Sequence, residues 1–311
     1  MPARKDPVRV ISHVVVYAVF YVTPLFLGFG LLMEEVLGTL AGLTLANLAA
    51  AFFANWLSLK IYCEMSITAI GLRWNRASAD NLALGLLGGA GAACLTLAPP
   101  LLLHVSRISS TPDDRPTILT PLFVTACLFI GSSAEEMLFR GFGLQTLITG
   151  FGEFPSVAVC AIVFGLLHLG NPGASPLGIA NTIGFGAIFG YAFLRSRDLW
   201  MPIGLHFAWN FTLPLFGVKV SGLTMNVTGY EMSWTAGALW SGGKYGPEAS
   251  LLATAVLVVL FFYVRKAPVR RQSSPLTDPL VEIVVCEPPL LSQPSSLSHP
   301  LPPRSSEQPK N

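Results

Sequence analysis

Residues 120–140 read TPLFVTACLFIGSSAEEMLFR, an apolar stretch that ends with Glu135, Glu136 and Arg140. Its length suits a membrane-spanning helix, which needs about 20 mostly apolar residues. A carboxylate inside the hydrocarbon costs about 2.5–3.5 kcal/mol on insertion scales, so charged side chains in such segments are usually functional. The stretch therefore predicts a transmembrane helix that carries functional carboxylates.

The composition of the whole chain is that of a membrane protein. Of its 311 residues, 52% are hydrophobic and only 12% are charged, whereas soluble domains are about 25% charged. The net charge of +2 is small and indicates no nucleic-acid partner. We therefore expect an all-α fold, a polytopic transmembrane helical bundle whose first partner is the lipid bilayer.

Eight segments are apolar enough to be read as spans, namely 10–33, 37–58, 82–104, 118–139, 155–170, 177–194, 199–217 and 249–264. With a cytoplasmic N-terminus, fifteen Lys and Arg residues fall on the inner side and four on the outer side. This bias fits the positive-inside rule. Residues 1–265 are thus expected to form the membrane domain of an integral protein of the bacterial cytoplasmic membrane, with both termini in the cytoplasm.

The last part of the chain has a different composition. Residues 266–311 contain ten prolines and eight serines. Segments rich in these residues bury too little apolar surface to fold alone. We expect a disordered cytoplasmic tail.

The two adjacent glutamates have different geometric relations to Arg140. Glu136 and Arg140 are four residues apart, so they share one helix face and can form an ion pair. Glu135 is rotated by about 100° from Glu136. The pattern predicts one neutralised carboxylate and one available carboxylate, although the pair could also serve helix packing alone.

Two further helices carry strongly polar side chains in apolar surroundings. His168 follows Phe164 by four residues, and His206 precedes Asn210 by four. Polar groups in a membrane bundle tend to face its interior and one another. The sequence therefore predicts one polar site built by three helices.

These residue types suit hydrolysis of an acyl bond. A buried carboxylate can act as a general base that activates water, while histidine and asparagine can donate hydrogen bonds to the developing oxyanion. Two alternatives stay open. Two histidines and a glutamate are also a catalytic zinc ligand set, and polar residues in spans also occur in non-enzymatic transport, immunity or scaffold proteins.

Three motifs in this order, Glu-Glu-x-x-x-Arg, Phe-x-x-x-His and His-x-x-x-Asn, lie within residues 117–217. Together they resemble the CAAX prenyl endopeptidase and bacteriocin-processing superfamily, the Abi family, which is related to the Ras-converting protease. The resemblance implies an all-helical intramembrane glutamate protease with eight spans. The site that it implies comprises the water-activating base Glu135, its assistant His168, the oxyanion residues His206 and Asn210, and the supporting pair Glu136 and Arg140.

The same resemblance also indicates what the protein would bind. The substrate would be a peptide or a membrane protein, with or without an attached lipid. No metal ion or other cofactor is expected, although zinc is not excluded.

The depth of the catalytic residues sets a condition on the helix that begins at residue 118. If that helix ended at Phe139, Glu135 would lie near the membrane surface. His168 lies thirteen residues beyond Pro155, about 20 Å along a helix. Residues 141–154 are apolar enough to extend the helix to about Ile148, and we predict that extension. A break there that left Glu135 far from His168 would contradict a shared site.

Overall fold

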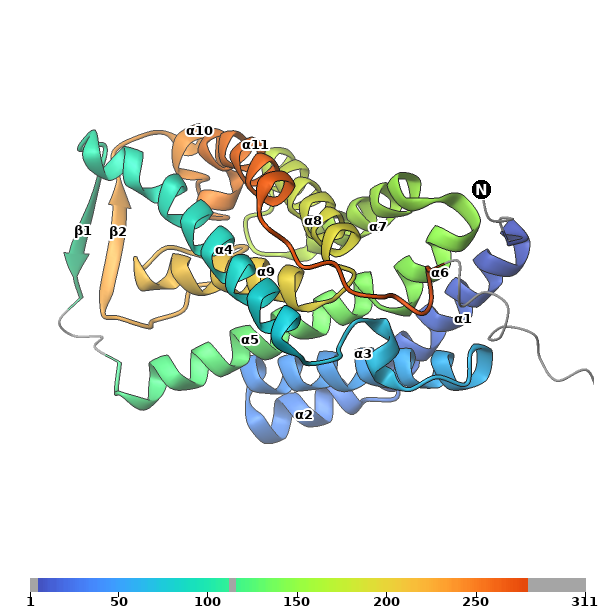
Figure 1. Ribbon diagram of the computed structural model, residues 1–311. Coiled ribbons are helices and arrows are strands. Elements are labelled where there is room, and N and C mark those ends of the chain that lie inside the picture. The colour runs from blue at the N-terminus through green and yellow to red at the C-terminus, as the bar shows by residue number, and fades with distance from the viewer. Residues whose placement is uncertain (1–4, 112–115, 279–311) are drawn as a thin grey trace, which may run out of the picture.

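The computed structural model describes residues 5–111 and 116–278, and these are mostly helical (Figure 1). The helices are α1 (Pro7–Phe26), α2 (Phe29–Leu37), α3 (Thr39–Tyr62), α4 (Arg76–Leu102), α5 (Leu119–Arg140), α6 (Phe142–Phe151), α7 (Glu153–Leu167), α8 (Pro176–Ser196), α9 (Trp200–Leu215), α10 (Ala238–Ser241) and α11 (Leu251–Lys266). Short 3-10 turns are η1 (Ile67–Ile70), η3 (His168–Gly170) and η4 (Pro247–Ala249), and the strands are β1 (Ser106–Ser110) and β2 (Tyr230–Trp234).

Six helices in the described part of the chain are long and apolar enough to cross a membrane, with α5 and α6 taken as one span. This supports an integral membrane protein. The prediction of eight spans is confirmed only in part, because α9 and α11 have 16 residues each. A helix of that length measures about 24 Å, less than the bilayer core of about 30 Å.

A two-stranded sheet corrects the all-α prediction. β1 pairs antiparallel with β2, and Ile108 lies opposite Met232. The sheet lies at one end of the bundle in Figure 1, where Met232 is buried against the core. The two strands lie in connections far apart in the chain, so their pairing depends on the folded bundle. No local sequence pattern predicts it.

The first predicted span, 10–33, is two helices in the structure. α1 ends at Phe26, and Gly28 has a φ of +84°. A second turn at Gly38, with a φ of +79°, brings α2 back against α3. Both angles lie in the left-handed region that glycine adopts without cost.

α9 packs between α4 and α5 (Figure 1). Its approach to α4 depends on glycine, because a Cβ atom on Gly85 would lie 2.4 Å from the Met201 carbonyl oxygen. A Cβ on Gly89 would lie 2.2 Å from the Leu205 carbonyl oxygen. Small residues allow such close helix contacts in membrane proteins. This contact sets the position of the helix that carries His206 and Asn210.

The predicted continuous helix up to Ile148 is interrupted at Gly141, which separates α5 from α6. Asn55 of α3 bridges the break. Its Nδ2 donates to the Met137 carbonyl oxygen at 3.0 Å, and its Oδ1 accepts from the Phe142 amide at 2.8 Å. In a continuous helix the Phe142 amide would donate to the Leu138 carbonyl oxygen; here Asn55 accepts from the amide, and Tyr17 Oη donates to that carbonyl oxygen at 2.9 Å, so both freed backbone groups keep partners.

The break at Gly141 does not place Glu135 and His168 at different depths in the membrane. From Glu135 to Phe151 the chain advances sixteen residues, about 24 Å, and from Glu153 to His168 it returns fifteen, about 22 Å. The outward and return paths are therefore nearly equal, and Glu135 and His168 line one cavity. The condition for a shared site is met although the helix is not continuous.

Part of the segment predicted to be disordered is packed against the bundle. Residues 267–278 run from the end of α11 to α6, drawn in red-orange in Figure 1. Their hydrogen bonds join Arg270 to Asn81 (2.9 Å), Gln272 to Asp198 (2.5 Å) and Ser274 to Gln145 (3.1 Å). The ordered chain therefore extends past residue 265, because its polar groups meet polar partners on α4, α6 and the α8–α9 turn. The rest of the predicted tail, 279–311, lies outside the described residues.

Candidate active site

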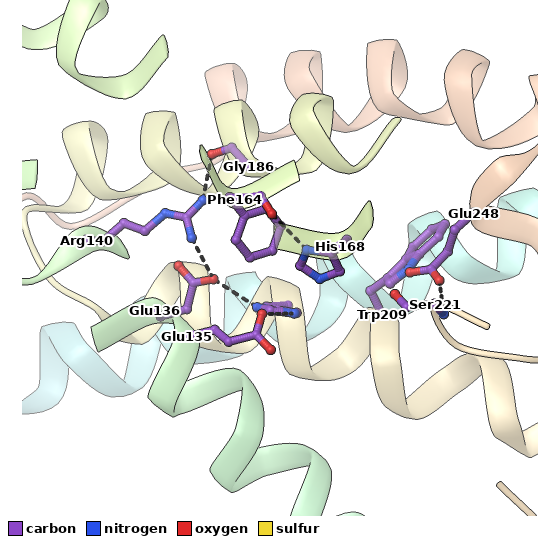
Figure 2. Close-up of polar contacts among 10 residues, drawn as sticks. Glu135, Glu136, Arg140, Phe164, His168, Gly186, Trp209, Ser221 and Glu248 are labelled. Carbon is purple, nitrogen blue, oxygen red and sulfur yellow. Dashed lines mark hydrogen bonds and ion pairs between the residues drawn. The ribbon is translucent and has the colours of Figure 1, made fainter. Parts of the chain in front are cut away.

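The last turn of α5 contains a buried ion pair, as the spacing predicts. Glu136 and Arg140 are both fully buried, with Oε1 and Nη1 3.2 Å apart. Arg140 Nη2 also donates to the Gly186 carbonyl oxygen at 2.7 Å, and its guanidinium lies 5.1 Å from the ring centre of Phe164. These contacts neutralise Glu136 and attach α5 to α8 (Figure 2).

His206 contacts both glutamates. Its Nδ1 lies 2.9 Å from Glu136 Oε1, and its Nε2 lies 3.8 Å from Glu135 Oε2. The ring also stacks on Phe189, with centroids 4.9 Å apart. Glu136 is thus shared by Arg140 and His206, a link that the sequence did not predict. The contact between Glu136 and His206 Nδ1 orients the imidazole so that Nε2 lies toward Glu135.

Glu135 differs from its neighbour in having no arginine or lysine bound to it among the described residues, and its nearest basic group is His206 Nε2 at 3.8 Å. Its side chain is 30% exposed and lines the cavity. Its Oε2 atom is buried and makes no hydrogen bond to any described residue. A carboxylate oxygen in this condition is available to accept a proton from a bound molecule.

His168 lies at the C-terminal end of α7, where its Nδ1 is 2.7 Å from the Phe164 carbonyl oxygen (Figure 2). A carbonyl oxygen only accepts hydrogen bonds, so Nδ1 carries the hydrogen. This assignment follows from the hydrogen-bond partner. In the neutral ring, Nε2 then has a free lone pair.

Asn210 lies one turn after His206 on α9, and its side chain makes no hydrogen bond within the described part of the chain. Together with Glu135, His168 and His206 it lines a single cavity of about 370 Å³. The structure therefore brings together all four residues that the sequence placed in the catalytic site.

A second carboxylate lines this cavity and was not predicted from the sequence. Glu248, in η4, is 6% exposed and lines the same space. Its Oε1 accepts from Trp209 Nε1 at 3.0 Å, and its Oε2 accepts from the Ser221 amide (Figure 2). No sequence pattern distinguishes it from a solvated carboxylate, because its burial comes from the packing of two loops.

The side chains do not form a ready metal site. Within residues 5–111 and 116–278, no three His, Cys, Asp or Glu side chains are grouped so that they could hold a metal ion. Nδ1 of His206 is bound to Glu136 and Nδ1 of His168 to a carbonyl oxygen, so Nε2 is the nitrogen left free in each ring.

Residues in the middle of the chain match a known protein family. Searches of curated proteins and of solved structures find no significant similarity. A family model described as type II CAAX prenyl endopeptidase Rce1-like matches residues 117–212. That segment runs from the start of α5 into α9 and contains all three motifs, in agreement with the resemblance inferred from them. Residues 117–212 therefore match the Rce1-like family of type II CAAX prenyl endopeptidases.

Proposed function

We propose that this chain is an intramembrane endopeptidase in which Glu135 activates water to cleave a peptide bond of a membrane-attached or lipidated substrate. The observation that carries the proposal is the buried Glu135 Oε2 atom, which has no hydrogen-bond partner among the described residues. It borders a cavity that also holds His168, His206 and Asn210. The match of residues 117–212 to a family of endopeptidases supports the reaction class.

Glu135 and His168 are the proposed proton acceptors. A water molecule between them would donate one hydrogen to Glu135 and the other to the lone pair on His168 Nε2. The oxygen then attacks the carbonyl carbon while Glu135 takes the proton and later delivers it to the leaving amine. General bases of this kind contribute about 10²- to 10⁴-fold to the rate.

His206 and Asn210 are the proposed oxyanion donors. Both lie on one face of α9, and the Asn210 amide is not committed to another described residue. In its protonated form His206 donates from Nδ1 to Glu136 and keeps Nε2–H for the carbonyl oxygen of the substrate. Glu136 and Arg140 are then supporting residues that hold the imidazole in place. Such fixed donors stabilise charge that develops in the transition state.

The test is a cleavage assay on purified protein in detergent or nanodiscs, with a prenylated peptide and a set of membrane proteins as substrates. Glu135→Gln and His168→Ala should each lower cleavage by at least about 10²-fold. Glu35→Gln, which changes the exposed member of the glutamate pair near the end of α2, is the matched control and should cleave normally. Full cleavage by Glu135→Gln would contradict the proposal. Loss of cleavage on adding a chelator would favour a metal-dependent protease.

We further propose that the protease domain of residues 1–265 is oriented with both chain ends in the cytoplasm. The basis is the distribution of Lys and Arg: fourteen lie on the proposed inner side and four on the outer, while Arg140 is buried within the α5–α6 span. Labelling of single cysteines placed at Lys266 and at Lys244 with a membrane-impermeant reagent tests it. Only the second should react in intact cells.

A further inference from the structure

The cavity lining is unbalanced in charge. Glu135 and Glu248 both line it, the basic groups that line it among the described residues are His168 and His206, and only His206 contacts a carboxylate there, Glu135 at 3.8 Å. The charge of Glu136 is matched by Arg140, with which it is buried. The space next to Glu248 is therefore negative and favours a cationic ligand.

Glu248 lacks a cationic partner in the described part of the chain, where its side chain takes part in no ion pair. It accepts hydrogen bonds from one indole N–H and one backbone N–H, and each carboxylate oxygen has a second acceptor position. Buried charges in proteins are normally paired. A bound cation would supply the missing partner.

The carboxylate is held in place rather than mobile. Asn181 Nδ2 donates to the Glu248 carbonyl oxygen at 2.8 Å and to that of Ser250 at 3.0 Å. The side chain is fixed at both oxygens, by α9 through Trp209 and by the loop at Ser221. Groups fixed in this way bind a ligand without losing much conformational freedom.

The distance from the reacting centre suits a neighbouring residue of the substrate. Trp209, which binds Glu248, follows His206 by three residues, about 4.5 Å along α9. One residue of an extended peptide spans about 3.3–3.6 Å. A peptide with its reactive carbonyl at His206 and Asn210 would therefore place a side chain one or two residues away near Glu248. The rings of Trp209 and Phe185, 4.5 Å apart, also line the cavity and suit the apolar stem of a long cationic side chain.

We infer that Glu248 is a specificity-determining residue that binds the ammonium or guanidinium group of a Lys or Arg side chain one or two residues from the cleaved bond. The inference rests on the proposed function, since it assumes a peptide in the cavity. It adds a preference for basic residues that the catalytic residues alone do not require.

The experiment measures binding, so that it does not depend on cleavage. The probes are palmitoylated, N-acetylated hexapeptides with a fluorescent label, in which one lysine is moved through each position of an Ala/Leu background. A matched set carries norleucine, which has no charge, in place of lysine. Affinities are measured by fluorescence polarisation on full-length protein that carries Glu135→Gln. At one or two adjacent positions lysine should bind about ten- to a hundredfold more tightly than norleucine.

Three variants in that background separate charge from architecture. Glu248→Gln removes the charge and should bring the lysine-to-norleucine ratio close to one. Trp209→Phe removes the hydrogen bond to Oε1 but leaves the charge, and should keep the preference. Glu231→Gln changes an exposed carboxylate on β2 and is the control for nonspecific attraction. Melting temperatures confirm that each variant is folded.

A lysine preference that Glu248→Gln abolishes and Glu231→Gln does not would support the inference. Equal affinity for the two peptide sets, including no binding by either, would overturn it. So would a preference that survives Glu248→Gln, or an equal loss for both sets, which would assign Glu248 to loop packing. The cleavage assay on the wild-type protein tests the proposed function separately.

Discussion

At the scale of single residues, two adjacent glutamates are in opposite situations. Glu136 is fully buried and bound by Arg140 and His206. Oε2 of each glutamate has no hydrogen-bond partner among the described residues, but of the two only Glu135 is partly exposed to the cavity. A rotation of about 100° per residue is enough to separate them. One carboxylate therefore organises the site while the other is available for chemistry.

The buried pair gives a first prediction about stability. Arg140→Ala should destabilise the protein by about 3–5 kcal/mol, because it leaves the Glu136 charge buried without its partner. Arg140→Lys should recover only part of this loss, since a lysine cannot reproduce both the Gly186 contact and the stacking on Phe164. Unfolding in detergent monitored by tryptophan fluorescence measures the effect. Arg270→Ala, which breaks the exposed pair with Asp80, should cost under about 1 kcal/mol.

The residue scale also shows what the sequence could and could not predict. The i,i+4 spacing of Glu136 and Arg140 correctly predicted their ion pair, because it depends on one helix alone. The contact of His206 with Glu136 needed the relative position of two helices. Glu248 was missed because a carboxylate in a polar loop is ordinary in sequence, and only the folded loops around Ser221 bury it.

At the scale of elements, the site depends on how closely α9 approaches α4. Gly89→Ala would place a Cβ 2.2 Å from the Leu205 carbonyl oxygen, so the helices must move apart and shift His206. We expect a lower melting temperature and cleavage reduced by about tenfold or more, since displacements of about 1 Å can cost a hundredfold. Gly91→Ala lies two residues further along the same helix in open space and is the control. Equal behaviour of the two variants would contradict the role of the contact.

The helices themselves were easier to predict than their interruptions. Apolar runs placed α3, α4, α7 and α8 close to their observed positions. The breaks at Gly28 and Gly141 were not predicted, because the residues on both sides are apolar and continue the pattern. At Gly141 the deciding partner is Asn55, more than eighty residues earlier in the chain. Hydrophobicity therefore locates spans, and long-range hydrogen bonds decide where they bend.

At the scale of the whole molecule, residues 267–278 pack against the helical bundle, although the sequence composition predicted that they belong to a separate tail. They connect α11 to α4, to the α8–α9 turn and to α6. Composition predicted a disordered tail from residue 266, because proline and serine dominate the segment as a whole. The prediction failed for its first part, because a few polar side chains find buried partners such as Asn81 and Asp198.

This connection can be tested by truncation. A chain that ends at Ala267 should melt at a lower temperature than one that ends at Asp278, because Asn81, Gln145 and Asp198 each lose a partner. A buried polar group left unsatisfied costs about 1–3 kcal/mol. The chain ending at Asp278 keeps every described contact and is the control. Equal melting temperatures would show that the segment does not stabilise the bundle.

Protein synthesis runs from the N-terminus to the C-terminus, and domains form in that order as the chain emerges. Asn81, Gln145 and Asp198 are therefore in place before the ribosome has made Arg270, Gln272 and Ser274, which bind them. During that interval the newly inserted helices hold exposed polar groups at one end of the bundle. That end of the bundle therefore closes only after residues 270–274 have been made and can reach their partners.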